Sequence, residues 1–139
     1  MSVRVTYSTP MLHVMDIERS LAFYKLLGFV TVDTDGGNPL GWARMHCEGG
    51  ALMFLRAEHA VDPRAQGILL YMYAPDLMAL RTALHGSGVA VPHIGYPEYM
   101  TSGEMRLVDP DGYSVIVAHW GNKEQEIWEK RIKAQPPRG

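Results

Sequence analysis

The sequence predicts an α+β protein made of two similar halves, each a β-α-β-β-β module, followed by a C-terminal helix. A short motif repeats at a fixed distance: Asp16-Ile17 and Gly28-Phe29 return as Asp76-Leu77 and Gly88-Val89, sixty positions later in both cases (16 to 76, 28 to 88). In both halves an apolar, strand-like run precedes the aspartate, and a new apolar run begins after the glycine. Self-similarity at a fixed period indicates a duplicated structural unit.

The segment between each aspartate and glycine predicts a helix of about eleven residues. Asp16 and Asp76 suit the N-cap, because a carboxylate accepts hydrogen bonds from the free backbone N–H groups of the first turn. Gly28 and Gly88 suit the left-handed position after the helix end. Apolar residues recur at helical spacing between them: Leu21, Phe23, Tyr24 and Leu27 in the first helix, and Leu77, Leu80 and Leu84 in the second.

Apolar runs bounded by turn residues predict the strands. They cover residues 9–15, 29–33, 42–47 and 51–56 in the first half, and 68–74, 89–94, 104–108 and 113–119 in the second. Asp109-Pro110-Asp111-Gly112 is a strong turn signal before the last strand, and we interpret both aspartates as turn formers. A polar linker over 57–66 separates module one (1–58) from module two (66–120), and the two modules form one domain of residues 1–120.

Residues 121–139 depart from the repeat and predict a C-terminal helix with a tail. Asn122 suits the N-cap and Pro136-Pro137 ends the helix. Its apolar side, with Trp128 at the centre, either covers the sheet of its own chain or contacts a partner subunit. We favour the partner, because tryptophan is a common anchor of interfaces.

Composition excludes several classes of protein. A formal net charge of -2 without a long basic run gives no electrostatic basis for binding nucleic acid. No stretch approaches the roughly 20 apolar residues of a membrane span, and the first ten residues lack a secretory pattern. Cys47 is the single cysteine, as in proteins of a reducing compartment. We expect a cytoplasmic protein with neither nucleic acid nor membrane as a partner.

Two segments carry a family resemblance. The first segment comprises residues 11–24 and the following Leu27-Gly28-Phe29, and it resembles the opening motif of the vicinal-oxygen-chelate superfamily. The second segment, residues 103–113, resembles the closing motif of the same superfamily. This superfamily includes glyoxalase I, extradiol dioxygenases and bleomycin-resistance proteins. The resemblance covers residues 1 to about 120. It implies that the sheets of the two modules curl around a cleft, which is a natural place for a small ligand.

Enzymes of this superfamily bind a divalent metal through His and Glu or Gln on four strands. The resemblance places these ligand positions at Thr9, Phe54 (or Met53 if the short turn shifts the register), Leu69 and Ile116. Such side chains do not form a transition-metal site. His13 lies about 13 Å along the strand from Thr9, and His119 points to the opposite face from Ile116. We therefore expect no metal, no cofactor and no catalytic residue.

The sequence then resembles the metal-free bleomycin-resistance branch, whose members bind a drug between two subunits without chemistry on it. This implies a homodimer that sequesters an aromatic or amphipathic compound, such as an antibiotic, and so confers resistance. Arg44 is either solvated or turned inward, where it favours an anionic ligand; Trp42, Arg44 and His46 share one face of a strand. The expected ligand-binding residues are Thr9, Met11, Trp42, Arg44, Phe54, Leu69, Tyr71, Tyr73, Tyr99 and Ile116.

Two alternatives remain open. The chain is a lyase, isomerase or dioxygenase of the same superfamily with an atypical metal site, or it is an interaction module whose core is filled. A stoichiometric transition metal in the purified protein indicates the enzyme. A rise in thermal stability with small ligands excludes the filled module, because a ligand that binds only the native state stabilises it.

Overall fold

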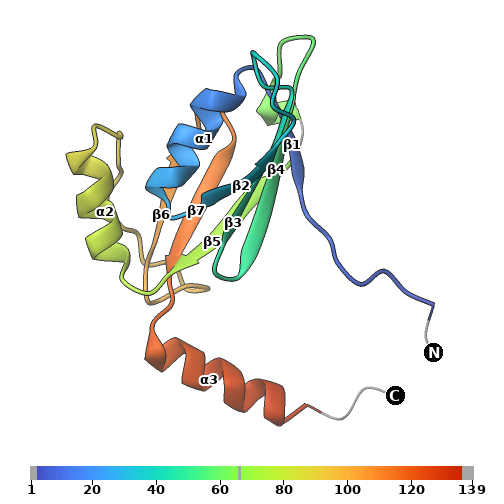
Figure 1. The fold of residues 1–139 in the computed structure, drawn as a ribbon. Helices are drawn as coiled ribbons and strands as arrows, with labels where there is room; N and C mark the ends of the chain where they lie inside the picture. Colours follow the sequence, from blue (N-terminus) through green and yellow to red (C-terminus); the bar gives the residue numbers. More distant parts are fainter. Residues whose placement is uncertain (1–2, 66, 136–139) are drawn as a thin grey trace. The chain divides into compact units, whose positions relative to one another are not determined.

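The computed structural model describes residues 3–65 and 67–135 and contains two compact units (Figure 1). The first unit comprises the chain up to Ile68 together with Asp109–Tyr113. The second unit comprises Leu69–Val108 and the chain from Ser114 onward. The expected end of the last helix at Pro136-Pro137, and the last linker residue, Gln66, lie outside the described residues.

The first unit is a mixed four-stranded sheet with one helix. Strand β1 is parallel to β4, and the other neighbours are antiparallel, in the order β1-β4-β3-β2. Its elements are β1 (Met11–Val14), α1 (Ile17–Leu26), β2 (Val30–Thr34), β3 (Trp42–Cys47), β4 (Gly50–Arg56) and the short 3-10 helix η1 (Pro63–Ala65).

The second unit is a mixed three-stranded sheet with two helices. Strand β7 lies between β5, to which it is parallel, and β6, to which it is antiparallel. Its elements are β5 (Leu69–Ala74), α2 (Leu77–Gly86), β6 (Glu104–Val108), β7 (Ser114–His119) and α3 (Asn122–Lys133). The predicted α+β class, with two mixed sheets and a C-terminal helix, is confirmed.

The predicted helix signals are also confirmed. The Asp16 carboxylate accepts the Arg19 N–H at 3.2 Å, and the Asp76 carboxylate accepts the Ala79 N–H at 3.0 Å. Gly28 and Gly88 follow the two helices with φ of +98° and +83°, in the left-handed region that glycine enters without steric cost.

One face of each sheet is covered by its own helix, as α1 shows over the strands of the first unit in Figure 1. Side chains alternate between the faces of a strand, so the residues that face the helix are every second one along it. Under α1 these residues are Leu12, Val14, Ala43, Met45, Leu52 and Phe54. Their counterparts on the α2 side of the second sheet are Leu70, Ala74, Met105, Leu107, Val115 and Val117.

The strand expected over residues 89–94 is absent, so the second half is β-α-β-β and that prediction is wrong. This stretch contains Pro92, which has no N–H to donate to a ladder. The Pro92 carbonyl instead accepts a hydrogen bond from Arg81 Nε at 2.8 Å. Only an isolated bridge between Gly95 and Glu104 forms here.

The C-terminal helix α3 begins one residue away from the expected cap. Gly121, and not Asn122, is the N-cap residue. The Glu124 carboxylate accepts the Gly121 N–H at 3.0 Å and the Ser102 hydroxyl at 2.6 Å, which fixes the start of the helix. In the described part of the chain, no helix is long and apolar enough to cross a membrane.

The turn Asp109–Tyr113 packs within the first unit through its two aspartates. Asp109 Oδ1 accepts the N–H groups of Asp111 and Tyr113, both at 2.9 Å, which confirms Asp109 as a turn former. Its Oδ2 accepts the Tyr24 hydroxyl of α1 at 2.7 Å in a buried hydrogen bond. Burial raises the pKa of Asp109, and burial with the nearby Asp109 charge raises the pKa of Tyr24.

Asp111 contacts the N-terminal end of α1. Its carboxylate accepts the Met15 N–H at 2.9 Å, the Arg19 guanidinium at 3.2 Å and the Ser20 hydroxyl at 3.4 Å. The Asp111 side chain is almost fully buried, whereas Arg19 is about half exposed. The turn is therefore a structural part of the first unit.

Replacing Tyr24 by Phe is expected to lower the free energy of unfolding by about 1–3 kcal/mol, because the Asp109 carboxylate loses a buried partner. Urea denaturation of wild type and variant measures the difference. Tyr96→Phe, which changes an exposed tyrosine in the second unit, is the matched control and should unfold like wild type. Equal midpoints for Tyr24→Phe and Tyr96→Phe would contradict the assigned role of this hydrogen bond.

Candidate functional site

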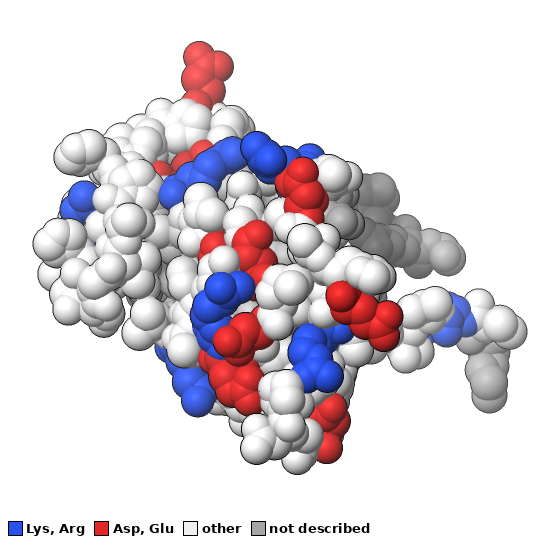
Figure 2. Space-filling view, turned by 90° about the horizontal axis from the view of Figure 1, so that it is seen from above, with Lys and Arg blue, Asp and Glu red and all other residues white. Residues whose placement is uncertain are grey.

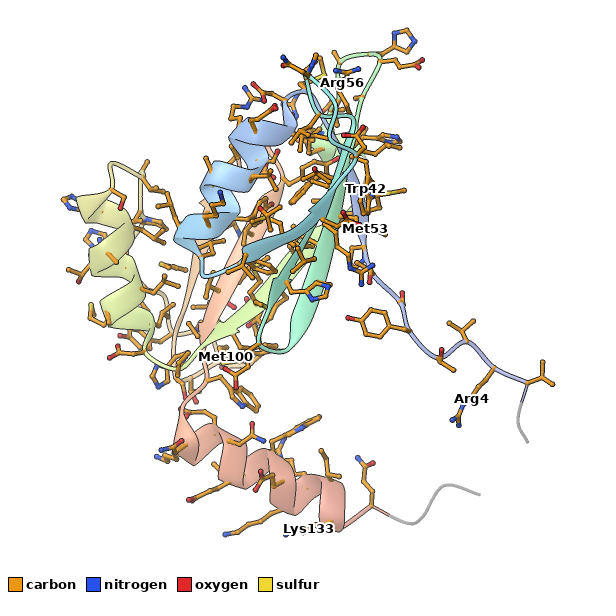
Figure 3. The ribbon with its side chains drawn as sticks, viewed as in Figure 1. Arg4, Trp42, Met53, Arg56, Met100 and Lys133 are labelled. Atoms are coloured by element: carbon orange, nitrogen blue, oxygen red, sulfur yellow. The ribbon has the colours of Figure 1, made fainter. Side chains whose placement is uncertain are left out.

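Each sheet has a second face that its own helix leaves uncovered, which we call its open face. Figure 3 shows Trp42 and Met53 on the side of the first sheet away from α1. The open face of the first unit carries Met11, His13, Trp42, Arg44, His46 and Met53. The open face of the second unit carries Leu69, Tyr71, Tyr73, Glu104, Arg106 and Ile116.

Phe54 does not lie on the open face, so its prediction as a ligand-binding residue is wrong. It is fully buried under α1, with its ring centroid 5.3 Å from that of Tyr24. The pairing of Gly50 with Cys47 sets the register of β4, so that Met53 pairs with Arg44 on the open face. The alternative register, with Met53 at this position, is the one observed.

Thr9 was expected on the first strand, but β1 begins only at Met11. The Thr9 side chain still reaches the open face of the first unit, because its hydroxyl accepts a hydrogen bond from Arg44 NH2 at 3.3 Å. Arg44 is half-buried and lies along this face. Its Nε donates to His46 Nε2 at 2.8 Å, and its guanidinium carbon lies 5.9 Å from the Tyr7 ring centroid.

Four aromatic rings follow one another in the second unit, and we call them the aromatic row. Ring centroids lie 5.5 Å apart between Tyr71 and Tyr73, 5.2 Å between Tyr73 and Trp120, and 6.3 Å between Trp120 and Trp128. The edge-to-face angles and these distances are favourable for aromatic pairs. Tyr73 is 59% exposed and Tyr71 37% exposed. The row therefore offers ring surface to a ligand.

Glu104 accepts two tyrosine hydroxyls beside the aromatic row and was not identified from the sequence. The Tyr71 hydroxyl donates at 2.7 Å and the Tyr99 hydroxyl at 2.5 Å. The hydrogen bond to Glu104 is the main cause that raises the pKa of Tyr99. Burial, followed by the bond to Glu104, raises the pKa of Tyr71. The sequence feature that indicates a polar position here is the alternation of the charged residues Glu104 and Arg106 on the strand predicted over 104–108.

Ile116 lies on the open face of the second sheet, as expected, but is only 3% exposed. It lies on the central strand of this sheet and pairs with Tyr71 on one side and Arg106 on the other. Leu69 is exposed at the start of β5. Tyr96, the second tyrosine of the loop before β6, is exposed as well.

Figure 2 shows lysine and arginine side chains interspersed with aspartate and glutamate on the face that it draws. The formal net charge of the chain is -2. A protein that binds nucleic acid through its surface usually presents a continuous basic stripe. This face has a mixed charge pattern instead.

The side chains at the positions that the resemblance assigns to metal ligands do not fit a metal. With the observed register these positions hold Thr9, Met53, Leu69 and Ile116, which supply a hydroxyl, a thioether and two hydrocarbons. Divalent ions in proteins are held mainly by carboxylate, imidazole, thiolate or carbonyl donors, and none of these four side chains supplies one. Among residues 3–65 and 67–135, no three His, Cys, Asp or Glu side chains are grouped to hold an ion.

Comparison with known proteins gives a family and a fold. The family model described as "Glyoxalase/Bleomycin resistance protein/Dioxygenase superfamily" matches residues 6–117. A search of curated proteins found no match.

Three solved structures illustrate the fold. A bleomycin resistance determinant encoded on the transposon Tn5 is 23% identical, with a TM-score of 0.67 over 83% of this chain and 98% of the other. A bleomycin-binding protein complexed with bleomycin is also 23% identical, with a TM-score of 0.67 over 84% and 99%. A protein of unknown function from Agrobacterium tumefaciens is 21% identical, with a TM-score of 0.67 over 86% and 97%.

Replacing Glu104 by Gln is expected to lower the pKa of Tyr99 and that of Tyr71. The Glu104 charge favours the protonated hydroxyl and repels the phenolate, so its removal lets the phenolate form at lower pH. A spectrophotometric titration of tyrosinate around pH 10, the ordinary range of tyrosine, should show more phenolate in the variant. Glu98→Gln, in the same loop, is the control; identical curves for all three proteins would count against the assigned network.

Proposed function

Because the chain belongs to the glyoxalase/bleomycin resistance protein/dioxygenase superfamily, we propose that it binds a small aromatic or amphipathic molecule without metal-dependent chemistry. Binding alone then performs the function, by sequestering the compound. A compound of the antibiotic class is the first candidate for the ligand.

The aromatic row carries this proposal. Exposed rings contribute large apolar areas and also hold a ligand by stacking, each well-placed ring pair adding about 0.5–1.5 kcal/mol. Tyr71 and Tyr73 leave ring surface free, while Glu104 fixes the orientation of the Tyr71 hydroxyl. Ligand sites typically combine apolar and aromatic walls with a few oriented polar groups. The open face of the second unit has both components.

The chemistry of the four family positions supports binding without a metal. Lewis-acid catalysis by this fold needs an ion that polarises substrate oxygens. Thr9, Met53, Leu69 and Ile116 supply no carboxylate or imidazole to hold such an ion. We therefore assign no catalytic residue.

The structural relatives support an antibiotic as ligand. One of them is a bleomycin-binding protein in complex with bleomycin, and another is a bleomycin resistance determinant. We propose a function of the same kind for this chain, with the site residues Thr9, Met11, Trp42, Arg44, Leu69, Tyr71, Tyr73, Tyr99 and Ile116 retained as candidates and Met53 and Glu104 added. Phe54 is no longer proposed as a contact.

Metal-free bleomycin is the first probe of this function. Titration into chelator-treated protein is expected to quench tryptophan fluorescence saturably, because Trp120 lies in the aromatic row next to Tyr73. Tyr73→Ala should weaken the affinity by about tenfold, the loss of one stacked ring. Met78→Ala removes an equally exposed side chain from α2 and is the matched control.

Two results would overturn the proposal. The first is the absence of saturable binding for bleomycin and for a panel of aromatic antibiotics. The second is a stoichiometric transition metal in protein purified without added metal, measured by elemental analysis, which would favour a lyase, isomerase or dioxygenase.

We further propose that residues 1–120 act as one binding domain in a cytoplasmic homodimer. Helix α3 supports the dimer: none of its residues is buried, and Ile127, Trp128 and Ile132 are each about half exposed. Apolar side chains gathered on one helix commonly mark an interface.

If the chain forms a homodimer, it should sediment as a particle of twice the mass of the 15.5 kDa chain. Trp128→Ser should shift the equilibrium towards the monomer, because an aromatic anchor is lost from the interface. Analytical ultracentrifugation at several concentrations measures this shift, with the exposed Lys123→Ser as control. A wild-type protein that stays monomeric throughout would exclude the dimer.

A further inference from the structure

We propose that Arg44, with Thr9, binds the carboxylate of a ligand that has an apolar body, on the open face of the first sheet. This inference rests on the proposed function, because it names a chemical class for the molecule that the protein binds. It concerns the first unit alone, and its residues lie outside the aromatic row.

In the described part of the chain, the hydrogen-bond partners of the Arg44 guanidinium are an imidazole, a hydroxyl and a thioether, and none is a carboxylate. Nε donates to the His46 imidazole at 2.8 Å, NH2 to the Thr9 hydroxyl at 3.3 Å, and NH1 points to the Met53 sulfur at 3.8 Å. Among residues 3–65 and 67–135, no carboxylate oxygen lies within 4.0 Å of Arg44. The side chain is half-buried, so its positive charge is partly removed from water without being balanced by a negative one.

The nearest acidic residue in register is directed elsewhere. Asp33 on β2 pairs with Arg44 on β3, which places both side chains on the same side of the sheet. The Asp33 carboxylate accepts the backbone N–H of Thr34 at 2.9 Å and is exposed. Arg44 is therefore held by the strand beside a carboxylate that does not neutralise it.

The geometry of the partners leaves the end of the guanidinium available. His46 accepts from Nε and fixes the plane of the group, whereas among the described residues Nη1 and Nη2 donate only to the Met53 thioether and, in a long bond, to Thr9. A carboxylate accepts two parallel N–H bonds from such a fork, and these charge-assisted bonds are about twice as strong as neutral ones. A ligand carboxylate therefore replaces the weak hydrogen bonds of Arg44 to the Met53 sulfur and the Thr9 hydroxyl with strong, charge-assisted ones. The Thr9 hydroxyl can then donate its own proton to the same carboxylate.

The surroundings select the rest of the ligand. Trp42 lies two residues before Arg44 on the same face, and the exposed Met11 pairs with Met53 beside it. Thioether and indole groups adapt to flat apolar surfaces. The class that fits is an aromatic or branched carboxylate whose acid group faces Arg44.

Benzoate is the probe, and benzamide is its neutral counterpart of the same shape. Two-dimensional NMR titration of the full chain should show benzoate binding at least about tenfold more tightly than benzamide, the gain expected from hydrogen bonds to a charged group. Shifts should concentrate on Thr9, Arg44 and His46. Benzylphosphonate serves as a third arm: tighter binding than benzoate would replace the carboxylate by a phosphonate and overturn the stated ligand class.

Arg44→Gln should abolish the preference for benzoate, and Arg44→Lys should reduce it, because lysine keeps the charge and loses the fork. Arg64→Gln is the matched control, because Arg64 forms an exposed ion pair with Asp62 in the same unit. This variant should bind benzoate like wild type. Thr9→Val tests the site independently of Arg44 and should weaken benzoate several-fold with no effect on benzamide. Thermal melts establish that each variant is folded.

Equal affinities for benzoate and benzamide in wild type, or a preference that survives in Arg44→Gln, would overturn the inference. If bleomycin still binds in that case, the proposed function stands and only the carboxylate class fails. If neither bleomycin, the antibiotic panel nor the two benzoyl probes bind, the proposed function and this inference fail together.

Discussion

A pleated sheet has two faces, and one helix covers only one of them; the rest of this structure depends on that constraint. In both units the residues beneath the helix form the buried core, and their neighbours along the strand point to the open face. Phe54 and Met53 are adjacent in sequence and belong to different faces. The residues that form the core of each unit and the residues that form its open face therefore alternate along the same strands.

The sequence was a good guide to features that depend on local chemistry. The caps at Asp16 and Asp76, and the left-handed glycines that follow, depend on groups within four residues of each other, so one repeat found in the sequence predicted both helices. The strand expected over residues 89–94 had apolar composition, but composition does not show whether a partner edge is available. Pro92 removes a donor from that stretch, and an arginine side chain takes its carbonyl.

The open faces were predicted less completely, because they depend on register and on distant contacts. Alternation placed Trp42, Arg44, Tyr71 and Tyr73 together on their strands. A single-residue shift of register exchanged Phe54 for Met53, since neighbouring residues point to opposite sides. The role of Glu104 as acceptor of two tyrosine hydroxyls could not be predicted, because Tyr99 comes from the loop before β6 and Tyr71 from β5. No pattern within one segment shows that these residues meet.

The contacts of the Asp109–Tyr113 turn have a consequence for which substitutions this chain tolerates. Its two carboxylates accept hydrogen bonds from backbone groups, from the Tyr24 hydroxyl and from the start of α1. A substitution of either aspartate therefore disturbs the folding of the first unit. On the open faces, by contrast, the side chains of Met11 and Tyr73 are 49% and 59% exposed. Substitutions at such exposed positions are expected to change the unfolding free energy little, whereas substitutions of the two buried aspartates are expected to destabilise the first unit.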